Sequence, residues 1–141
     1  MNKGFTFIEV LIVLLIVTVI TSVTIAGYSN IQREQSFLSF YQQLEKDVMT
    51  IQLQAITTNQ TTEIVFTNNG TRYVARQSFT KTLFTRDIPS EIVYRNEGTL
   101  TSVSFNPNGT IVKFGTLVFE NGQKKEYVKF YIGKGRMELA E

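Results

Sequence analysis

The chain has 141 residues, a length typical of one domain, and 43% of them are hydrophobic and 18% charged. Its 14 basic and 12 acidic residues leave a net charge of +2, too small to indicate a general nucleic-acid-binding protein. The absence of Cys and His excludes disulfides, thiol nucleophiles, imidazole bases and zinc sites built from these residues. Catalysis would have to rely on carboxylates, but the sequence contains no recognisable paired-carboxylate motif and no phosphate-binding loop. We therefore expect a protein that is not an enzyme and that holds no metal and no cofactor.

The N-terminal segment is strongly apolar. Residues 5–26 read FTFIEVLIVLLIVTVITSVTIA, in which Glu9 is the one charge. A helix of this length spans about 33 Å at ~1.5 Å per residue, enough for the ~30 Å hydrocarbon core of a bilayer. Lys3 precedes the segment and the next basic residue is Arg33, so the positive-inside rule places the N-terminus in the cytoplasm and the rest outside. The sequence therefore predicts a single-pass membrane helix over residues 5–27.

Two other interpretations of this segment are open. One is a cleavable secretory signal with Thr24-Ile25-Ala26 as an imperfect cleavage site, and the other is a buried core helix. Glu9 argues against both, because a carboxylate near the start of a spanning helix costs about 2.5–3.5 kcal/mol and usually marks a function and a partner.

The helix is predicted to continue beyond the membrane, because no proline occurs before Pro89. One apolar stripe recurs at spacings of three and four residues: Phe37, Tyr41, Leu44, Val48, Ile51 and Ala55. We predict one helix from about Phe5 to about Thr58. Its amphipathic outer half buries this stripe against a sheet.

Short segments separated by turn residues follow over residues 61–139. Thr62–Thr67 and Thr71–Arg76 flank Asn68-Asn69-Gly70, which indicates a hairpin. Alternation places Val128, Phe130 and Ile132 on one face of a strand. The further predicted strands are Glu91–Arg95, Leu100–Phe105, Thr110–Phe114, Gly115–Glu120, Glu126–Ile132 and Met137–Leu139. The predicted fold class is α+β, with a long N-terminal helix packed on an antiparallel β-sheet in an extracytoplasmic domain over residues 28–141.

The N-terminal residues Lys3-Gly4-Phe5-Thr6-Phe7-Ile8-Glu9-Val10-Leu11 resemble the signature of type IV pilins and pseudopilins. The resemblance implies a lollipop-shaped fold and a leader, residues 1–4, that prepilin peptidase removes after Gly4. It also implies that Phe5 becomes the N-methylated first residue and that Glu9 acts in filament assembly. An unpaired Glu9 is costly in lipid, so pairing with the Phe5 amine of a neighbouring subunit would bring the subunits into register.

The later sequence is similar to a narrower group. Gln54-Ala55-Ile56, the turn over residues 105–109 and the terminal residues 133–137 resemble the GspH/FimT-like globular domain of secretion pseudopilins and fimbrial minor pilins. The segment over residues 130–136 is most similar to a minor pseudopilin of the Gram-positive competence operon, the ComGD type.

This resemblance implies a structural subunit of the DNA-uptake pseudopilus, with other pilin subunits and prepilin peptidase as partners. It implies a single-pass membrane protein that reaches the cell surface after filament assembly. Two alternatives remain: a DNA-binding receptor on that filament, or a pseudopilin of a type II secretion system or type IV pilus.

A cluster of cations lies near the C-terminus. Residues 111–136 carry six basic and two acidic residues, and aromatic residues lie between them. Such a pattern suits contacts with phosphates and bases of DNA. The simpler interpretation is an ordinary solvated strand face. The candidate DNA contacts, here named the C-terminal basic strip, are Lys124, Lys125, Lys129, Lys134 and Arg136.

Overall fold

The computed structural model describes residues 6–133 and 135–140, and of residues 23–30 it describes the backbone alone. The chain forms two compact units, Met1–Gln35 and Ser36–Glu141. Helix α1 (Phe7–Thr58) begins in the first unit and ends in the second. The predicted helix is therefore confirmed over the described residues.

The part of α1 that belongs to the second unit carries the predicted apolar stripe. Phe37, Leu44, Val48, Ile51 and Ala55 are all buried. Phe40, which the sequence analysis did not include, is buried beside them, whereas Tyr41 is only partly buried. The helix is followed by Asn59 in the left-handed conformation (φ 54°), and the Gln60 N–H donates to the Ala55 carbonyl at 3.2 Å. This is the 6→1 hydrogen bond of a Schellman-type helix end.

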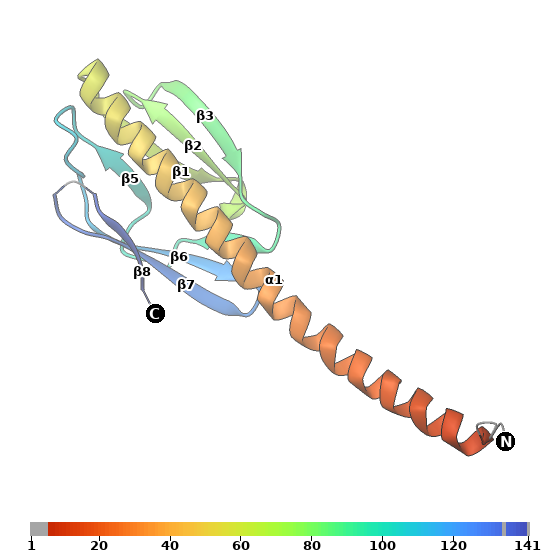
Figure 1. The fold of residues 1–141 in the computed structure, drawn as a ribbon. Helices are drawn as coiled ribbons and strands as arrows, with labels where there is room; N and C mark the ends of the chain where they lie inside the picture. The colour runs from red at the N-terminus through yellow and green to blue at the C-terminus, as the bar shows by residue number, and fades with distance from the viewer. Residues whose placement is uncertain (1–5, 134, 141) are drawn as a thin grey trace. The chain divides into compact units, whose positions relative to one another are not determined.

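The strands form two antiparallel sheets rather than the single sheet that the sequence predicted (Figure 1). The first sheet has the order β3-β2-β1-β5. Its strands are β1 (Thr62–Thr67), β2 (Arg72–Gln77), β3 (Lys81–Asp87) and β5 (Ser102–Phe105). The second sheet has the order β4-β6-β7-β8. Its strands are β4 (Ile92–Arg95), β6 (Gly115–Asn121), β7 (Lys124–Phe130) and β8 (Met137–Ala140).

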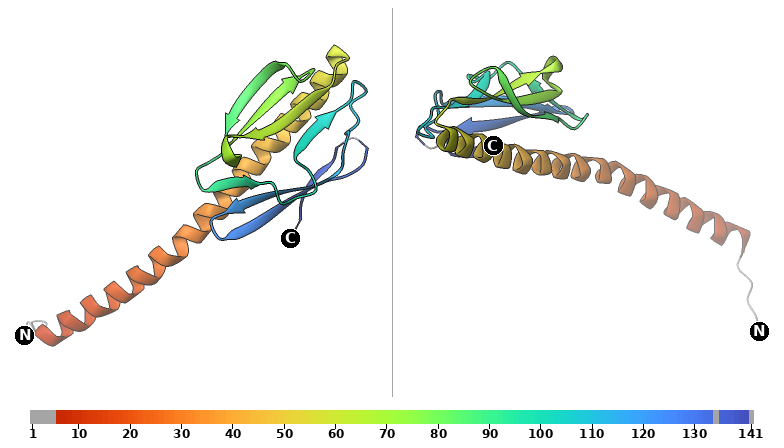
Figure 2. Two further views of the ribbon diagram at one scale, coloured as in Figure 1. Left: turned by 180° about the vertical axis from the view of Figure 1, so that it is seen from behind. Right: turned by 90° about the horizontal axis from the view of Figure 1, so that it is seen from above.

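Both sheets cover the same side of the C-terminal part of α1 (Figure 2). The centre of the core is aromatic: the ring of Phe119 on β6 lies within 6.3 Å of four other rings, centroid to centroid. These rings come from both sheets and from the helix: Phe37, Phe40, Phe66 and Tyr94. Because Phe119 is fully buried between the helix and the two sheets, the core is one continuous cluster.

The predicted hairpin at Asn68-Asn69-Gly70 is confirmed. These residues form the short 3-10 helix η1 (Asn68–Gly70) between β1 and β2, and all three have positive φ. Gly70 is required there for a second reason. A Cβ on this residue would lie 2.1 Å from the carbonyl oxygen of Tyr94, so only glycine allows this close approach of the turn to β4.

The predicted strand Thr110–Phe114 is wrong. Ile111 forms only an isolated bridge with Phe105. Its N–H donates to the Gly133 carbonyl, while the next N–H, on Val112, donates to the Ser104 carbonyl, so successive residues pair with different segments. The backbone bends at Val112, directly after the bridge, so the pairing does not continue as a strand.

Two further differences concern the presence of strand β3 and the end of strand β7. Strand β3 was not predicted, because its turn is built from Ser78 and Phe79, two non-glycine residues with positive φ (49° and 62°). Strand β7 ends at Phe130, and Ile132 is 75% exposed instead of buried as alternation predicted. Val128 and Phe130 are buried as expected.

Candidate functional site

The first turn of α1 is built around Glu9. Thr6 precedes the helix, and its carbonyl accepts hydrogen bonds from the Glu9 and Val10 N–H groups at 3.1 and 3.3 Å. The Glu9 carboxylate (Oε2) in return accepts the backbone N–H of Thr6 at 3.4 Å. Thr-x-x-Glu is the spacing of a capping box, and the negative charge also favours the positive end of the helix dipole. The Thr6-x-x-Glu9 spacing is present in the sequence, although the resemblance to pilins implied a role of Glu9 in assembly alone.

Gly4 and Phe5, the predicted cleavage and methylation residues, lie outside the described residues. Their roles therefore stay predictions.

The helix that follows Glu9 exposes apolar side chains on all sides. Every side chain from Thr6 to Ser22 is exposed. The three hydroxyl groups within residues 7–22 belong to Thr18, Thr21 and Ser22, and each donates to a backbone carbonyl three or four residues earlier at 2.7–3.0 Å. These polar groups are thus satisfied inside the helix, as an apolar environment requires. Over the described residues, no helix combines the length and the apolar character needed to span a membrane.

The described residues of the C-terminal basic strip lie in different surroundings. Lys125 and Lys129 lie on the exposed face of β7, whose intervening residues Glu126 and Val128 are buried. Lys124 Nζ contacts the Glu126 carboxylate at 2.9 Å. Arg136 lies before β8 and, with Glu45 and Gln52 of α1, lines a separate recess of about 220 Å³. Lys134 lies outside the described residues.

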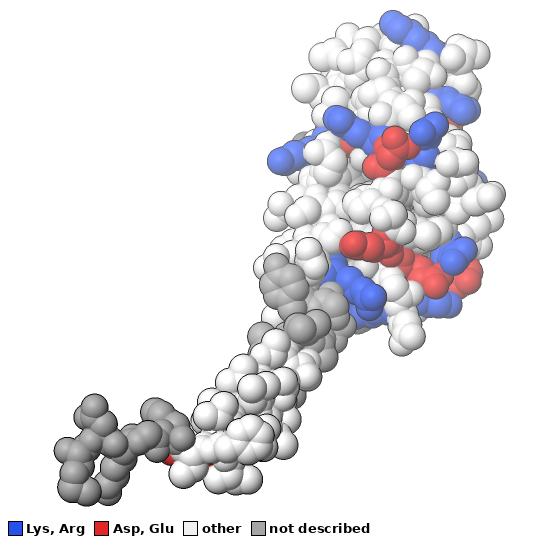
Figure 3. Space-filling model, turned by 90° about the vertical axis from the view of Figure 1, so that its right-hand side faces the viewer, with Lys and Arg blue, Asp and Glu red and all other residues white. Residues whose placement is uncertain are grey.

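Carboxylates lie close to the lysines of strand β7. Lys125 Nζ contacts the Glu97 carboxylate at 2.7 Å; the hydrogen bond and charge of Glu97 raise the pKa of Lys125, and Lys125 likewise lowers the pKa of Glu97. Lys129 lies opposite Glu138 of β8 in the strand register. On the face of the protein shown in Figure 3, basic and acidic side chains also lie next to one another. The described part of the strip is therefore closer to a solvated strand face than to a phosphate-binding surface.

Asp47 is a buried carboxylate that the sequence did not distinguish from the exposed ones. It is 4% exposed, and its oxygens accept hydrogen bonds from the Tyr73 hydroxyl at 2.7 Å, Arg86 Nε at 3.1 Å and Gln43 Nε2 at 3.1 Å. Burial, and then the hydrogen bond to Asp47, raise the pKa of Tyr73 far above its ordinary value. The guanidinium of Arg86 lies 5.4 Å from the ring centroid of Phe84. We assign this cluster a structural role, because it ties β2 and the edge strand β3 to α1.

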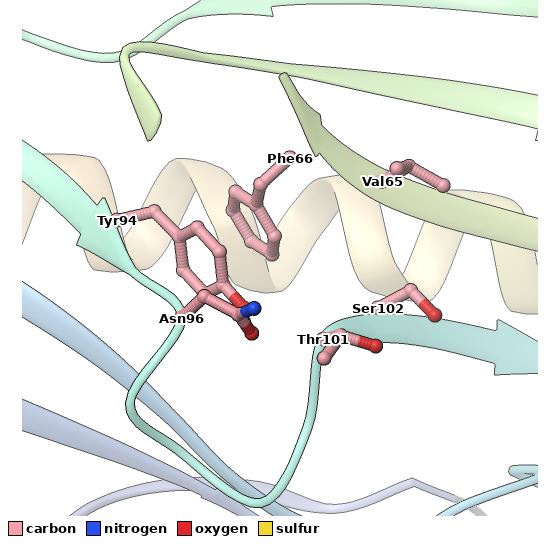
Figure 4. Close-up of a pocket in the computed structure, with 6 residues that line it drawn as sticks. All are labelled: Val65, Phe66, Tyr94, Asn96, Thr101 and Ser102. Carbon is pink, nitrogen blue, oxygen red and sulfur yellow. The ribbon is translucent and has the colours of Figure 1, made fainter. Parts of the chain in front are cut away.

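A recess of about 350 Å³ lies where the two sheets meet (Figure 4). The rings of Phe66 on β1 and Tyr94 on β4 stack at 4.1 Å with 16° between their planes. Asn96, Thr101 and Ser102 supply the polar part of the lining. The lining contains no carboxylate and no ammonium group, and Tyr94 is its one ionisable side chain. Phe66 belongs to the first sheet and Tyr94 to the second, so the stacking of their rings joins the two sheets at this recess.

Comparison with known proteins agrees with the N-terminal motif and with the fold described above. Residues 1–25 match the family model of the prokaryotic N-terminal methylation motif. The chain matches no curated protein sequence. Two crystal structures of the type IV minor pilin FimU from Pseudomonas aeruginosa are similar to it, with TM-scores of 0.59 and 0.57 at 14% and 15% sequence identity. Both matches cover 74% of this chain, and they cover 87% and 92% of the FimU chains. The predicted pilin-like α+β fold is therefore confirmed, whereas the similarity to the competence subunit stays a prediction.

Proposed function

We propose that this chain is a minor pseudopilin, a structural subunit that is processed at the membrane and assembled into a short surface filament. One combination carries the proposal: the methylation motif stands at the head of a helix whose side chains from Thr6 to Ser22 are all exposed and mostly apolar. An apolar surface of this extent is stable in a cell only when lipid or other apolar helices cover it. A subunit that is stored in the membrane and then packed into a filament satisfies this requirement in both states.

Processing by prepilin peptidase after Gly4 would give Phe5 a free amine, which is then N-methylated. That amine would immediately precede Thr6, whose N–H the Glu9 carboxylate already accepts. A carboxylate has about four lone-pair sites, so Glu9 keeps the capacity to accept the amine of a neighbouring subunit. In surroundings without water the attraction between the two charges is strong, which supports a role of this pair in assembly.

The proposed system is the competence pseudopilus, and the proposed process is DNA uptake. The similarity of residues 130–136 to ComGD-type subunits supports this choice. The proposed location is the cell membrane, with the N-terminus in the cytoplasm, and the cell surface after assembly. The DNA-receptor alternative has less support, because acidic residues accompany Lys124, Lys125 and Lys129 of the C-terminal basic strip.

Processing is tested by co-expression with a prepilin peptidase and by the mass of the mature N-terminus. We expect loss of residues 1–4 and block of this loss by Gly4→Val. Gly27→Val is the matched control, because it makes the same substitution in the same segment away from the cleavage site, and its processing should be normal. A mature N-terminus near Ala26, or no cleavage of the wild-type chain, would contradict the proposal.

The choice of system is tested separately, by deleting the gene. We expect loss of transformation with unchanged protein secretion, and restoration by the wild-type gene but not by Gly4→Val. Lost secretion with normal transformation would assign the subunit to a secretion system instead.

A further inference from the structure

The recess of about 220 Å³ that Arg136 lines lies between helix α1 and the segment that leads into β8. We name it the α1–β8 recess. Its apolar lining is formed by Val48 and Met137, which are 3% and 8% exposed, and by Met49, which is 58% exposed. Its charged lining is formed by Glu45 of the helix and Arg136 of the segment. Sites for drug-sized ligands measure about 300–1,000 Å³, so this recess fits a smaller molecule.

Contacts within the protein hold both walls of the recess. On the helix side, Gln52 Nε2 donates to the Gly109 carbonyl at 2.7 Å. On the other side, the backbone at Gly135 is buried with a φ of 69°, and a Cβ there would lie 2.6 Å from the ring of Phe105. Strand β8, which pairs with β7, begins two residues later. Because these contacts need no ligand, the recess is preformed, which reduces the entropy cost of binding.

Opposite charges line the recess without pairing with each other. Within the described residues, no ion pair includes Glu45 or Arg136. A second acid, Glu138 of β8, does not line the recess, and it accepts a hydrogen bond from the Tyr131 side chain. The lining therefore offers one carboxylate and one guanidinium. A ligand with a single charge would leave one of these groups unmatched, whereas a ligand that carries both an ammonium and a carboxylate group matches both.

We propose that the α1–β8 recess binds an α-amino acid with an apolar side chain. The two charged groups of an α-amino acid stand on one carbon atom, which makes it compact enough for the recess. Its ammonium group pairs with Glu45, and its carboxylate pairs with Arg136, whose guanidinium can donate two parallel hydrogen bonds. Its side chain contacts Val48, Met49 and Met137. This inference does not rest on the proposed function.

The test uses the full chain in a nonionic detergent, with ¹³C in the methionine methyl groups, and free leucine as the probe. The chain contains three methionines, and two of them, Met49 and Met137, line the recess. Met49→Leu and Met137→Leu assign their signals. We expect leucine to shift both signals until they saturate, with a Kd of about 1 mM for a ligand of this size.

Blocked ligands and variants identify which groups bind. N-acetyl-leucine lacks the ammonium group and leucine amide lacks the carboxylate, so each should bind about tenfold more weakly than leucine. Glu45→Gln should weaken binding of leucine about tenfold and leave binding of N-acetyl-leucine unchanged. Arg136→Gln should weaken binding of leucine to the same extent and leave binding of leucine amide unchanged.

Glu63→Gln and Arg76→Gln are the matched controls. These two residues lie opposite each other on β1 and β2, in the other sheet, and neither lines the recess. Both variants should bind leucine as the wild-type chain does. Thermal unfolding of every variant checks that the fold is kept.

Four outcomes would overturn the proposal. The first is equal binding of leucine and its two blocked derivatives, and the second is unchanged binding of leucine by the Glu45 and Arg136 variants. The third is a shift of the Met49 signal alone, because this exposed side chain would then report contact with the surface. The fourth is a shift of both signals by single-stranded oligothymidine at lower concentrations than by leucine, because the recess would then favour nucleic acid.

Discussion

Two arginines on the hairpin of β2 and β3 form ion pairs that differ mainly in the burial of the acid. Arg72 Nε contacts Asp87 at 2.6 Å, and Arg86 Nε contacts Asp47 at 3.1 Å. The Asp87 side chain is 74% exposed, whereas that of Asp47 is 5% exposed. Distance alone would rank the Arg72 pair as the stronger one. Burial predicts the opposite, because water screens the exposed pair and a buried carboxylate is costly without its partners.

The perturbation is Arg86→Met, which keeps much of the aliphatic side chain and removes the charge. Breaking a fully buried pair costs about 3–5 kcal/mol, but the Arg86 side chain is 49% exposed and Asp47 keeps Tyr73 and Gln43 as donors. We therefore expect a loss of about 1–2 kcal/mol. Arg72→Met is the matched control, with an expected loss of at most about 0.5 kcal/mol. Tyr73→Phe should cost about 1.5–3 kcal/mol, since it removes a hydrogen bond to a buried charge.

The assay is urea unfolding of the full chain in detergent micelles, followed by far-ultraviolet circular dichroism. Equal losses from Arg86→Met and Arg72→Met would refute the burial argument. A loss from Arg72→Met that exceeds the loss from Arg86→Met would mean that distance controls these pairs.

The cluster of Asp47, Tyr73 and Arg86 makes the free energy of unfolding depend on pH in the alkaline range. The pKa of Tyr73 is raised in the folded protein, first by burial and then by Asp47, so this residue keeps its proton where the unfolded chain loses it. Stability from Tyr73 is complete below the ordinary value of 10.0 and falls by about 1.4 kcal/mol per pH unit above it. Tyr73→Phe should reduce this slope by about that amount; an unchanged slope between pH 10 and 11 would contradict the assignment.

Three further predictions concern other parts of the chain. Glu9→Gln keeps an acceptor for the Thr6 N–H but removes the charge, so it should incorporate into sheared filaments as poorly as Glu9→Ala; incorporation at the wild-type level would show that the cap is sufficient. Phe79→Gly should raise the free energy of unfolding by about 0.5–1 kcal/mol, because Phe79 is exposed and has a φ of 62°; a lower urea midpoint would contradict this. Replacing the five cations of the C-terminal basic strip by Gln should leave DNA retention by the full chain at physiological salt almost unchanged, as measured by filter binding. A loss of retention together with a log–log salt slope reduced by about 4 would instead support the receptor alternative.

Local patterns in the sequence were sufficient to predict the elements whose structure depends on residues that are close in the sequence. The stripe from Phe37 to Ala55 predicted the buried face of α1, because residues three and four apart share one side of a helix. Asn68-Asn69-Gly70 predicted the first hairpin, because positive φ favours these residue types. The motif around Gly4, Phe5 and Glu9 is likewise contiguous, and the methylation family model covers it.

What the tertiary structure decided depends on residues far apart in the sequence. The β2–β3 turn has no turn signal, and β3 is held in part by the pairing of Arg86 with Asp47, 39 residues earlier. The charge of Lys125 is matched by Glu97, 28 residues earlier, which weakened the DNA interpretation of the C-terminal basic strip. The exposure of Ile132 follows from the end of β7 at Phe130, so alternation no longer applies to it. A periodic pattern indicates which face of an element is apolar, but the partner that covers this face, and the charges that meet across it, are set only when distant segments pack together.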